Sequence, residues 1–246
     1  MITDFSEKLL LVIVPGWGGT RETWSEFIGL AEKYFAISCV ELPCFGEEPC
    51  PTEVWGVAEY ASFLKNKLLS LGVSGADMIL LGHSFGGVVA TRLVADNPNI
   101  CSRLILSGPP IIRKKKGISK AIFWGAAKIG KIIFRVPFIE KFDVYARKVF
   151  YAAIKSDYNQ SSGIQKEIFK KIISEDQTGI LATIRIPTLV IFGDKDTYVD
   201  PRDGEKIASL IPNAELRLIA GGRHGLHMQQ PENLLRIISE FKNSGV

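Results

Sequence analysis

One serine in this chain stands where a hydroxyl can become reactive. The pentapeptide GHSFG at 82–86 follows the apolar run Met78–Leu81 and leads into a helical pattern. A serine raised on such a strand-to-helix turn leaves no room for side chains two positions away, and Gly82 and Gly86 remove that clash. The following helix presents unpaired N–H groups, which favour an oxyanion. The spacing therefore predicts that Ser84 is a nucleophile.

A serine hydroxyl needs a base to take its proton at neutral pH, and the chain has three histidines. His83 adjoins Ser84, so its side chain should point away from the hydroxyl, and we predict a structural role for it. His224 lies in the segment 221–227, which directly follows the predicted strand Glu215–Ala220, at the strand end where doubly wound sheets place their sites. We favour His224 as the general base and expect His227 to pack or to bond within the next turn.

A carboxylate should orient the imidazole, and three aspartates follow the apolar strand Thr188–Phe192. Asp200 precedes a proline and a helical pattern, which is typical of an N-cap. Asp194 is expected to support the turn by bonding backbone amides. Asp196 lies deeper in the loop, where it can reach a neighbouring loop. We therefore predict Asp196 as the third member of the set.

An oxyanion hole needs a second N–H group besides that of Phe85. The apolar strand Leu9–Val14 ends in the glycine-rich turn PGWGGT at 15–20. Such a turn allows backbone amides to face a ligand, and the N–H of Trp17 is the candidate donor. The turn matches neither glycine-rich phosphate-binding motif, so nucleotide binding has little support.

The elements that must position these residues alternate along the chain between apolar strands and helical patterns. Repeated strand–helix units predict an α/β fold with a mostly parallel, doubly wound sheet. The pattern turns helical in the middle, so we expect a core of residues 1–108 and 186–246 with a helical cap insertion at 109–185. The expected strands are 9–14, 35–41, 78–81, 102–107, 188–192 and 215–220, and the expected core helices are 20–34, 52–71 with Thr52 as N-cap, 87–97, 201–210 and 231–242.

Together these motifs resemble the α/β-hydrolase superfamily, in its esterase-like branch with a helical cap. The resemblance rests on segments 15–19, 42–46, 82–86, 192–196 and 222–224 and covers nearly the whole chain outside the cap. It implies that Ser84 is the nucleophile, Asp196 the acid and His224 the base. It also implies that the N–H groups of Trp17 and Phe85 bind the oxyanion. The chain order Ser, Asp, His agrees with this fold.

The sequence departs from the family pattern in two loops. Pro15 stands where members usually carry His, and Glu41 and Cys44 occupy the usual Asp and Gly positions of the D-x-P-G loop. The nucleophile is Ser84 rather than Asp, which disfavours the related haloalkane dehalogenases and epoxide hydrolases.

The resemblance implies hydrolysis of a carboxylic ester-type bond through an acyl-enzyme, with no metal or organic cofactor. The same residues acting on a C–C, amide or thioester bond remain an alternative. A non-catalytic ligand receptor on this fold is a third interpretation, which the intact Ser84, Asp196 and His224 set disfavours.

The expected cap is strongly basic. Between Ile111 and Phe150 stand eleven basic and two acidic residues, and the four bases Lys120, Lys128, Lys131 and Arg135 share one helix face near Trp124. The simpler interpretation is an apolar stripe over the active site with solvated lysines outside. The alternative is attraction to an anionic membrane surface or an acidic carrier protein. The chain's net charge of +4 is too small to indicate nucleic-acid binding.

The four cysteines, Cys39, Cys44, Cys50 and Cys101, form no C-x-x-C pair, which disfavours a zinc site. At 246 residues the chain needs no disulfide framework, so we expect reduced thiols and a cytoplasmic protein. The first residues lack the basic region of a signal peptide. The apolar run Leu9–Val14 is too short to span a membrane.

Overall fold

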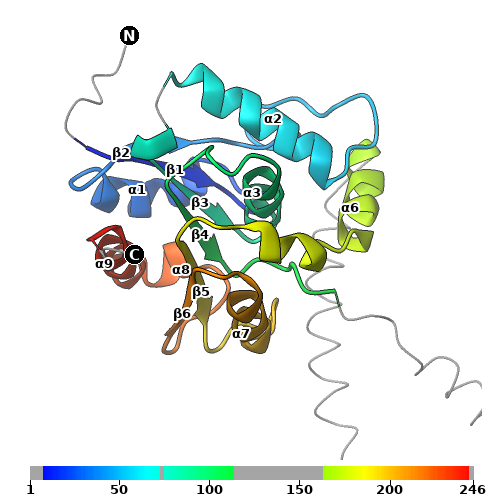
Figure 1. Ribbon diagram of the computed structural model, residues 1–246. Helices are drawn as coiled ribbons and strands as arrows, with labels where there is room; N and C mark the ends of the chain where they lie inside the picture. Colours follow the sequence, from blue (N-terminus) through cyan, green and yellow to red (C-terminus); the bar gives the residue numbers. More distant parts are fainter. Residues whose placement is uncertain (1–7, 73–74, 114–162, 244–246) are drawn as a thin grey trace, which may run out of the picture.

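Six parallel strands form one sheet at the centre of the protein, in the order β2-β1-β3-β4-β5-β6 (Figure 1). The computed structural model describes residues 8–72, 75–113 and 163–243. The strands are β1 (Leu10–Val14), β2 (Ala36–Cys39), β3 (Met78–His83), β4 (Arg103–Ser107), β5 (Thr188–Gly193) and β6 (Ala214–Ile219). The α-helices are α1 (Ser25–Ala31), α2 (Val57–Ser70), α3 (Phe85–Asp96), α6 (Ile164–Ser174), α7 (Pro201–Leu210), α8 (Leu226–Gln229) and α9 (Pro231–Asn243), and the 3-10 turns are η1 (Glu22–Trp24), η2 (Gly75–Asp77) and η3 (Thr178–Thr183).

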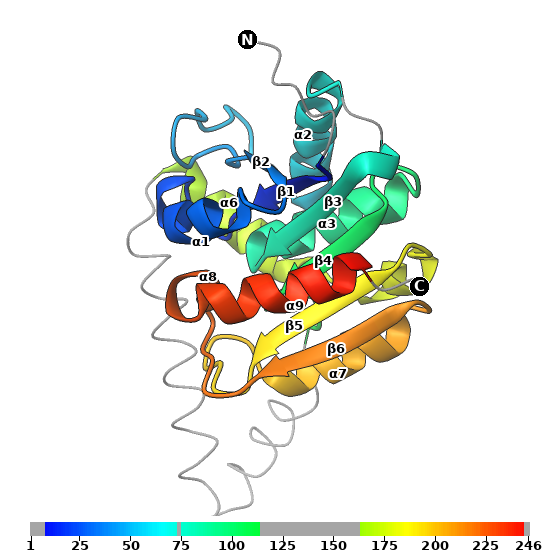
Figure 2. The same ribbon diagram turned by 90° about the vertical axis from the view of Figure 1, so that its left-hand side faces the viewer.

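Helices cover both faces of this sheet. β1, β3 and β5 are buried along their whole length, as continuous apolar runs in a parallel sheet require. Alternate residues of β1 enter two cores: Leu10 and Val12 pack with residues of α2 and α3, whereas Leu11 and Ile13 pack with residues of α1 and α9. Figure 2 shows α9 lying across one face, with α7 on the opposite face. The predicted doubly wound α/β fold is confirmed.

The chain changes direction across the sheet at β1. It passes from β1 to β2 on one side, and then returns to place β3 on the other side. Loops that follow two such strands diverge, and the crevice between them is where open α/β sheets bind ligands. Gly16 follows β1 and Ser84 follows β3, and a Cβ atom added to Gly16 would lie 3.0 Å from the Cβ of Ser84. The predicted nucleophile therefore stands at this switch point.

Two expected helices begin later than predicted. The expected helix 20–34 consists of η1 followed by the shorter α1. The N-cap prediction for Thr52 is wrong, because α2 begins only at Val57. Its first N–H groups find other acceptors: the Gly56 N–H donates to Oε2 of Glu59 at 2.7 Å, and the Val57 N–H donates to Oε2 of Glu175 at 3.0 Å.

The expectation of four reduced thiols is also wrong, since Cys44 and Cys50 form a disulfide bond. The loop after β2 folds back on itself, with the Cys44 N–H donating to the Glu48 carbonyl at 3.1 Å, and this turn brings the two sulfur atoms together. Cys39 and Cys101 are free, and burial raises the pKa of each thiol to about 12. The expectation of a cytoplasmic protein loses the support that four free thiols gave it.

Part of the expected cap can be located. α6 lies beside α2 (Figure 1), and the Arg113 guanidinium donates to the Ile172 and Glu175 carbonyls at the end of α6, at 3.1 and 3.0 Å. η3 packs against α3 and α7. Most of the basic stretch, including the lysine face near Trp124, lies outside the described residues. None of the helices in the described ranges is long and apolar enough to cross a membrane.

Candidate active site

Ser84 occupies a sharp turn between β3 and α3. Its backbone φ is 51°, a positive value that residues other than glycine rarely adopt. A Cβ atom at Gly82 would lie 2.6 Å from the Gly87 Cα, and one at Gly86 would lie 2.2 Å from the Val14 carbonyl oxygen. Both contacts are with backbone atoms that cannot move aside. Glycine at these two positions therefore allows the turn to raise Ser84 above the sheet, as the spacing predicts.

Three side chains from separate loops meet at this turn. Nε2 of His224, in the loop after β6, lies 2.9 Å from Oγ of Ser84. Nδ1 of the same ring lies 2.8 Å from Oδ2 of Asp196, in the loop after β5. An ionised carboxylate can only accept a hydrogen bond, so Nδ1 carries the ring proton and Nε2 is left to accept the proton of the serine hydroxyl. The structure thus brings Ser84, His224 and Asp196 into one hydrogen-bonded line.

Asp196 is held by its own loop independently of the histidine. Its side chain is buried, and Oδ1 accepts the N–H groups of Tyr198 at 2.7 Å and Val199 at 3.0 Å. These two bonds fix the carboxylate plane and leave Oδ2 for the imidazole. Gly108 packs against the pair. A Cβ atom added to Gly108 would lie 3.2 Å from Nδ1 of His224, so a side chain at this position would crowd the imidazole. The carboxylate and the imidazole are therefore largely enclosed by the protein.

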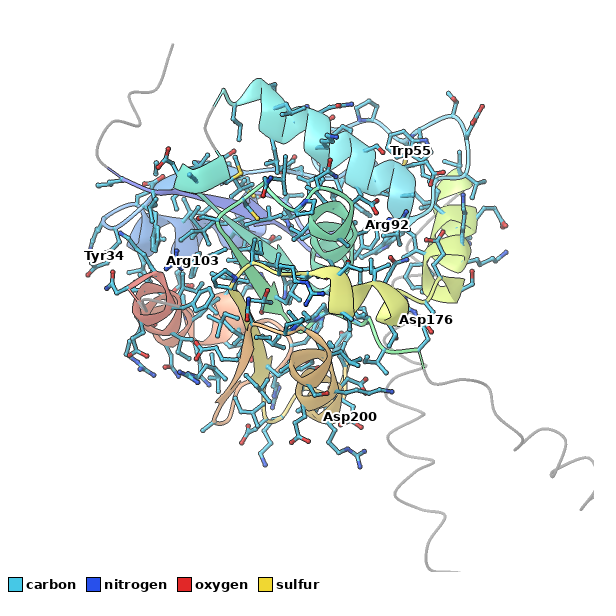
Figure 3. The ribbon with its side chains drawn as sticks, viewed as in Figure 1. Tyr34, Trp55, Arg92, Arg103, Asp176 and Asp200 are labelled. Atoms are coloured by element: carbon cyan, nitrogen blue, oxygen red, sulfur yellow. A yellow bond between two sulfur atoms is a disulfide. The ribbon has the colours of Figure 1, made fainter. Side chains whose placement is uncertain are left out.

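The other two aspartates of the loop have the structural roles that the sequence predicts. Oδ1 of Asp194 accepts the Gly221 N–H at 2.8 Å and so ties the loops after β5 and β6 together. Asp200 caps α7 by accepting the Arg202 N–H at 3.1 Å, and Figure 3 shows it at that helix. Neither carboxylate has a contact with His224 comparable to that of Asp196.

His83 and His227 lie beneath the site and away from the serine hydroxyl. Nδ1 of His83 donates to the Ser107 carbonyl at 3.0 Å, and the His227 ring stacks on Trp24 with centroids 4.0 Å apart. Burial lowers the pKa of His83 well below its ordinary value, and burial with the nearby His224 lowers the pKa of His227 to about 4. Both rings are therefore neutral at physiological pH.

The two predicted oxyanion donors lie close to the nucleophile. Phe85 is the first residue of α3, so its N–H has no acceptor within the helix. Trp17 follows the Gly16 that adjoins Ser84, and the Gly19 N–H closes this turn on the Gly16 carbonyl at 3.0 Å. The indole of Trp17 and the ring of Phe85 lie 5.6 Å apart. The role of their N–H groups as oxyanion donors stays a prediction.

Sequence reasoning missed an aromatic cluster around Trp17. Its indole makes edge contacts with Phe45 at 4.9 Å and with Phe169 of α6 at 5.0 Å, in addition to Phe85. Phe45 lies inside the Cys44–Cys50 loop. No local pattern marks these residues, because the four segments that carry them are far apart in the chain and only folding brings them together.

Glu41, which stands at the usual Asp position of the family loop, joins two loops beside the site. Its carboxylate accepts the Arg21 N–H at 2.8 Å and the Glu47 N–H at 3.1 Å. It fills the space beside Gly46, whose φ is 57°. The longer side chain at 41 thus supports both the loop after β1 and the loop after β2.

Within the described ranges, no group of three or more His, Cys, Asp or Glu side chains is placed to hold a metal ion. The hydrogen-bonded line of Ser84, His224 and Asp196 can instead activate a hydroxyl without a metal.

Comparisons with known proteins agree with this fold. The family model described as serine aminopeptidase, S33 matches residues 57–231. The chain is 27% identical to the polyketide synthase ThaQ of Burkholderia thailandensis. The match covers 90% of this chain but only 11% of that much longer protein. It is 28% identical to the pimeloyl-[acyl-carrier protein] methyl ester esterase of Wigglesworthia glossinidia brevipalpis, covering 96% of this chain and 94% of that one.

Among solved structures, a putative lipase from Acinetobacter baumannii superposes with a TM-score of 0.72 and 19% identity, covering 96% of this chain and 84% of that one. At that identity the likeness concerns the fold. The family match spans the nucleophile turn, α3, β5 and the loop after β6. The chain is therefore a hydrolase and belongs to the serine aminopeptidase S33 family of α/β-hydrolases.

Proposed function

We propose that this protein is a serine hydrolase that cleaves a carboxylic ester through an acyl-enzyme. The observation that carries the proposal is the line of two hydrogen bonds, 2.9 and 2.8 Å long, from Ser84 through His224 to Asp196. This geometry supports removal of the serine proton by an imidazole whose other nitrogen is held by a carboxylate.

The proposed reaction has two halves. In the first, Oγ of Ser84 attacks the ester carbonyl while Nε2 of His224 takes its proton. The N–H groups of Phe85 and Trp17 stabilise the oxyanion, and His224 then gives its proton to the leaving alcohol. In the second half, His224 takes a proton from the water that attacks the acyl-serine, and it returns this proton to Oγ of Ser84 as the acyl–oxygen bond breaks and the carboxylic acid is released.

The names of similar proteins favour an ester over the other bond types. By their printed names, similar proteins include an acyl-carrier-protein methyl ester esterase and lipases. The aromatic cluster of Trp17 beside the nucleophile also supplies an apolar surface for an acyl or alcohol group.

The first test is the Ser84→Ala variant, with Ser62→Ala as its control. Ser62 lies on the exposed side of α2, where its hydroxyl bonds the Ala58 carbonyl. We expect Ser84→Ala to lose hydrolysis of p-nitrophenyl esters and labelling by a fluorophosphonate probe, while its thermal unfolding stays near that of the parent. Ser62→Ala should keep both activities. Retained activity in Ser84→Ala would overturn the proposal.

We further propose that the basic segment at 111–150 attracts an acidic carrier protein that presents the acyl substrate. Eleven basic residues against two acidic ones provide the charge, and the Wigglesworthia relative is named for a carrier-bound ester. Binding to a purified acyl-carrier protein should weaken as salt rises, because exposed charges are screened over about 8–10 Å at physiological ionic strength. Absence of such binding, or binding only to anionic liposomes, would contradict the carrier proposal.

A further inference from the structure

One aromatic ring lies against the predicted general base. The ring of Tyr198 stacks on the imidazole of His224, with centroids 5.0 Å apart and planes inclined by only 13°. Tyr198 is 45% exposed, so core packing does not account for its position. Among the described residues, the stack on His224 is the one aromatic contact of this ring.

The backbone of Tyr198 holds the partner of the same imidazole. Its N–H donates to Oδ1 of Asp196 at 2.7 Å, and Oδ2 of that carboxylate contacts His224. One residue therefore contacts both members of the acid–base pair, the acid through its amide and the base through its ring. The hydrogen bond to Asp196 places the backbone of Tyr198 beside the site, from which its ring reaches His224.

The charge on His224 changes during the proposed reaction. When the imidazole takes the serine proton it becomes an imidazolium, and the face of an aromatic ring attracts a cation within about 6 Å of its centroid. We propose that Tyr198 is a positioning residue that holds the His224 ring and stabilises its cationic form. This inference rests on the proposed function of the site.

In the described part of the chain, four other groups surround the His224 ring, and none of them stacks on the ring face as Tyr198 does. Asp196 faces the ring from the loop after β5, and Ser84 faces it from the nucleophile turn. His83, at the end of β3, lies 4.9 Å from it between centroids, and His227 acts on it from α8. Both of these histidines are kept neutral by burial, so they neither neutralise nor strongly repel the imidazolium. Asp196 stabilises the cation from the ring edge and Tyr198 stabilises it from the ring face.

The test compares Tyr198→Leu with Tyr198→Phe. Leucine removes the aromatic face, whereas phenylalanine keeps it and loses only the hydroxyl. The rate of fluorophosphonate labelling of Ser84 is measured between pH 5 and 9. For Tyr198→Leu we expect the plateau rate to fall about two- to five-fold, the value of an exposed cation–π contact. The acidic midpoint should move to lower pH by roughly half a unit.

Three comparisons separate this role from simple support of the loop. Tyr198→Phe should match the parent in rate and midpoint. With a p-nitrophenyl ester, Tyr198→Leu should change kcat and leave KM nearly constant. Tyr34→Leu, which replaces another exposed tyrosine far from the site in the sequence, should change nothing. If Tyr198→Leu does not fold, Tyr198→Met takes its place.

A second measurement does not depend on catalysis. Because the chain has three histidines, their ring signals can be assigned by NMR after substitution of His83 and His227 in turn. The titration midpoint of the His224 signal should be lower in Tyr198→Leu than in the parent. An unchanged midpoint together with an unchanged labelling profile would overturn the inference. A loss in Tyr198→Phe equal to that in Tyr198→Leu would overturn it too, because the hydroxyl would then be the active group.

Failure of the proposed function gives a different result. If the parent protein is not labelled at Ser84 and hydrolyses no ester, the proposed function fails in the parent itself. If the parent is labelled and the Tyr198→Leu variant behaves identically, only the role of Tyr198 fails.

Discussion

Oδ2 of Asp196 lies 2.8 Å from Nδ1 of His224, although the two residues come from loops after different strands. The other carboxylate oxygen, Oδ1, accepts two backbone N–H groups of its own loop. The orientation of the acid is therefore set by its loop, and the acid in turn sets the tautomer of the histidine. This division of the two oxygens makes the effect of an amide substitution predictable.

Asp196→Asn should reduce kcat by about 10⁴-fold, the loss seen when an amide replaces the acid of such a triad. The two backbone donors keep the amide oxygen in the place of Oδ1, so the amide N–H₂ group faces His224. Nδ1 of the imidazole must then accept, and its proton moves to Nε2, where it can no longer take the proton of Ser84. Steady-state hydrolysis of a p-nitrophenyl ester measures this loss.

Asp194→Asn is the matched control for that substitution. Asp194 bonds the Gly221 N–H through one oxygen, and an amide oxygen can accept the same bond. We expect kcat within about three-fold of the parent, since the bond to the Gly221 amide is kept. A loss in Asp194→Asn as large as that in Asp196→Asn would show that the acid has been assigned wrongly.

Acid should destabilise the protein through His227. Its pKa is about 4 in the folded protein against 6.5 for an ordinary histidine, because its ring is buried against Trp24. Between these values the unfolded chain binds a proton that the folded protein does not, so stability falls as pH decreases from 6.5 toward 4. Urea unfolding at a series of pH values should show this decrease.

His227→Phe should reduce that decrease, because phenylalanine keeps the stack on Trp24 and takes no proton. Part of the decrease should persist in the variant, since His83 also has a lowered pKa through burial. An equal pH dependence in the parent and in His227→Phe would contradict the burial argument for His227.

Thiol labelling should distinguish the two pairs of cysteines. Without a reductant, native protein should take up no alkylating reagent, because Cys44 and Cys50 are bonded and burial raises the pKa of the Cys39 and Cys101 thiols. A mild reductant should expose two thiols, which mass spectrometry after digestion assigns to positions 44 and 50. Labelling of Cys44 before reduction would contradict the disulfide.

The disulfide should also stabilise the loop that carries Phe45. Replacement of both cysteines by serine should lower the free energy of unfolding by about 2 kcal/mol, the value for a short closed loop. The parent protein in reductant should unfold at the same urea concentration as this double variant, and an unchanged midpoint in reductant would contradict the prediction.

Local sequence patterns predicted the sheet and the residues that the fold brings together at Ser84. The apolar run into β3 and the two glycines around Ser84 lie within nine residues, and Trp17, Asp196 and His224 lie in loops that follow strands. Parallel strands bring such loops to one edge, so loop position together with the family resemblance predicted that Ser84, Asp196 and His224 would meet.

Contacts between distant segments could not be predicted in this way. α2 begins only at Val57, whose N–H is accepted by Glu175 from 118 positions away, and the local pattern around Thr52 does not show this. The pairing of Cys44 with Cys50 depends on the turn of the loop between them, which the cysteine spacing does not show. The stack of Tyr198 on His224 depends on how two loops approach each other, and no pattern in either loop encodes that approach.

The nucleophile turn should tolerate no side chain at Gly86. A Cβ atom there would lie 2.2 Å from the Val14 carbonyl oxygen and 2.4 Å from that of Pro15, so Gly86→Ala must push the turn away from β1. We expect a loss of about 2–3 kcal/mol in the free energy of unfolding and a large loss of Ser84 labelling.

Gly29, on the exposed side of α1 with no atom within 4 Å of an added Cβ, is the control. Gly29→Ala should stabilise the protein by about 0.5–1 kcal/mol, because alanine favours the helix, and it should leave labelling unchanged. Urea unfolding and probe labelling of both variants test this, and a Gly86→Ala protein as stable and as reactive as the parent would show that the turn is not packed against β1 as described.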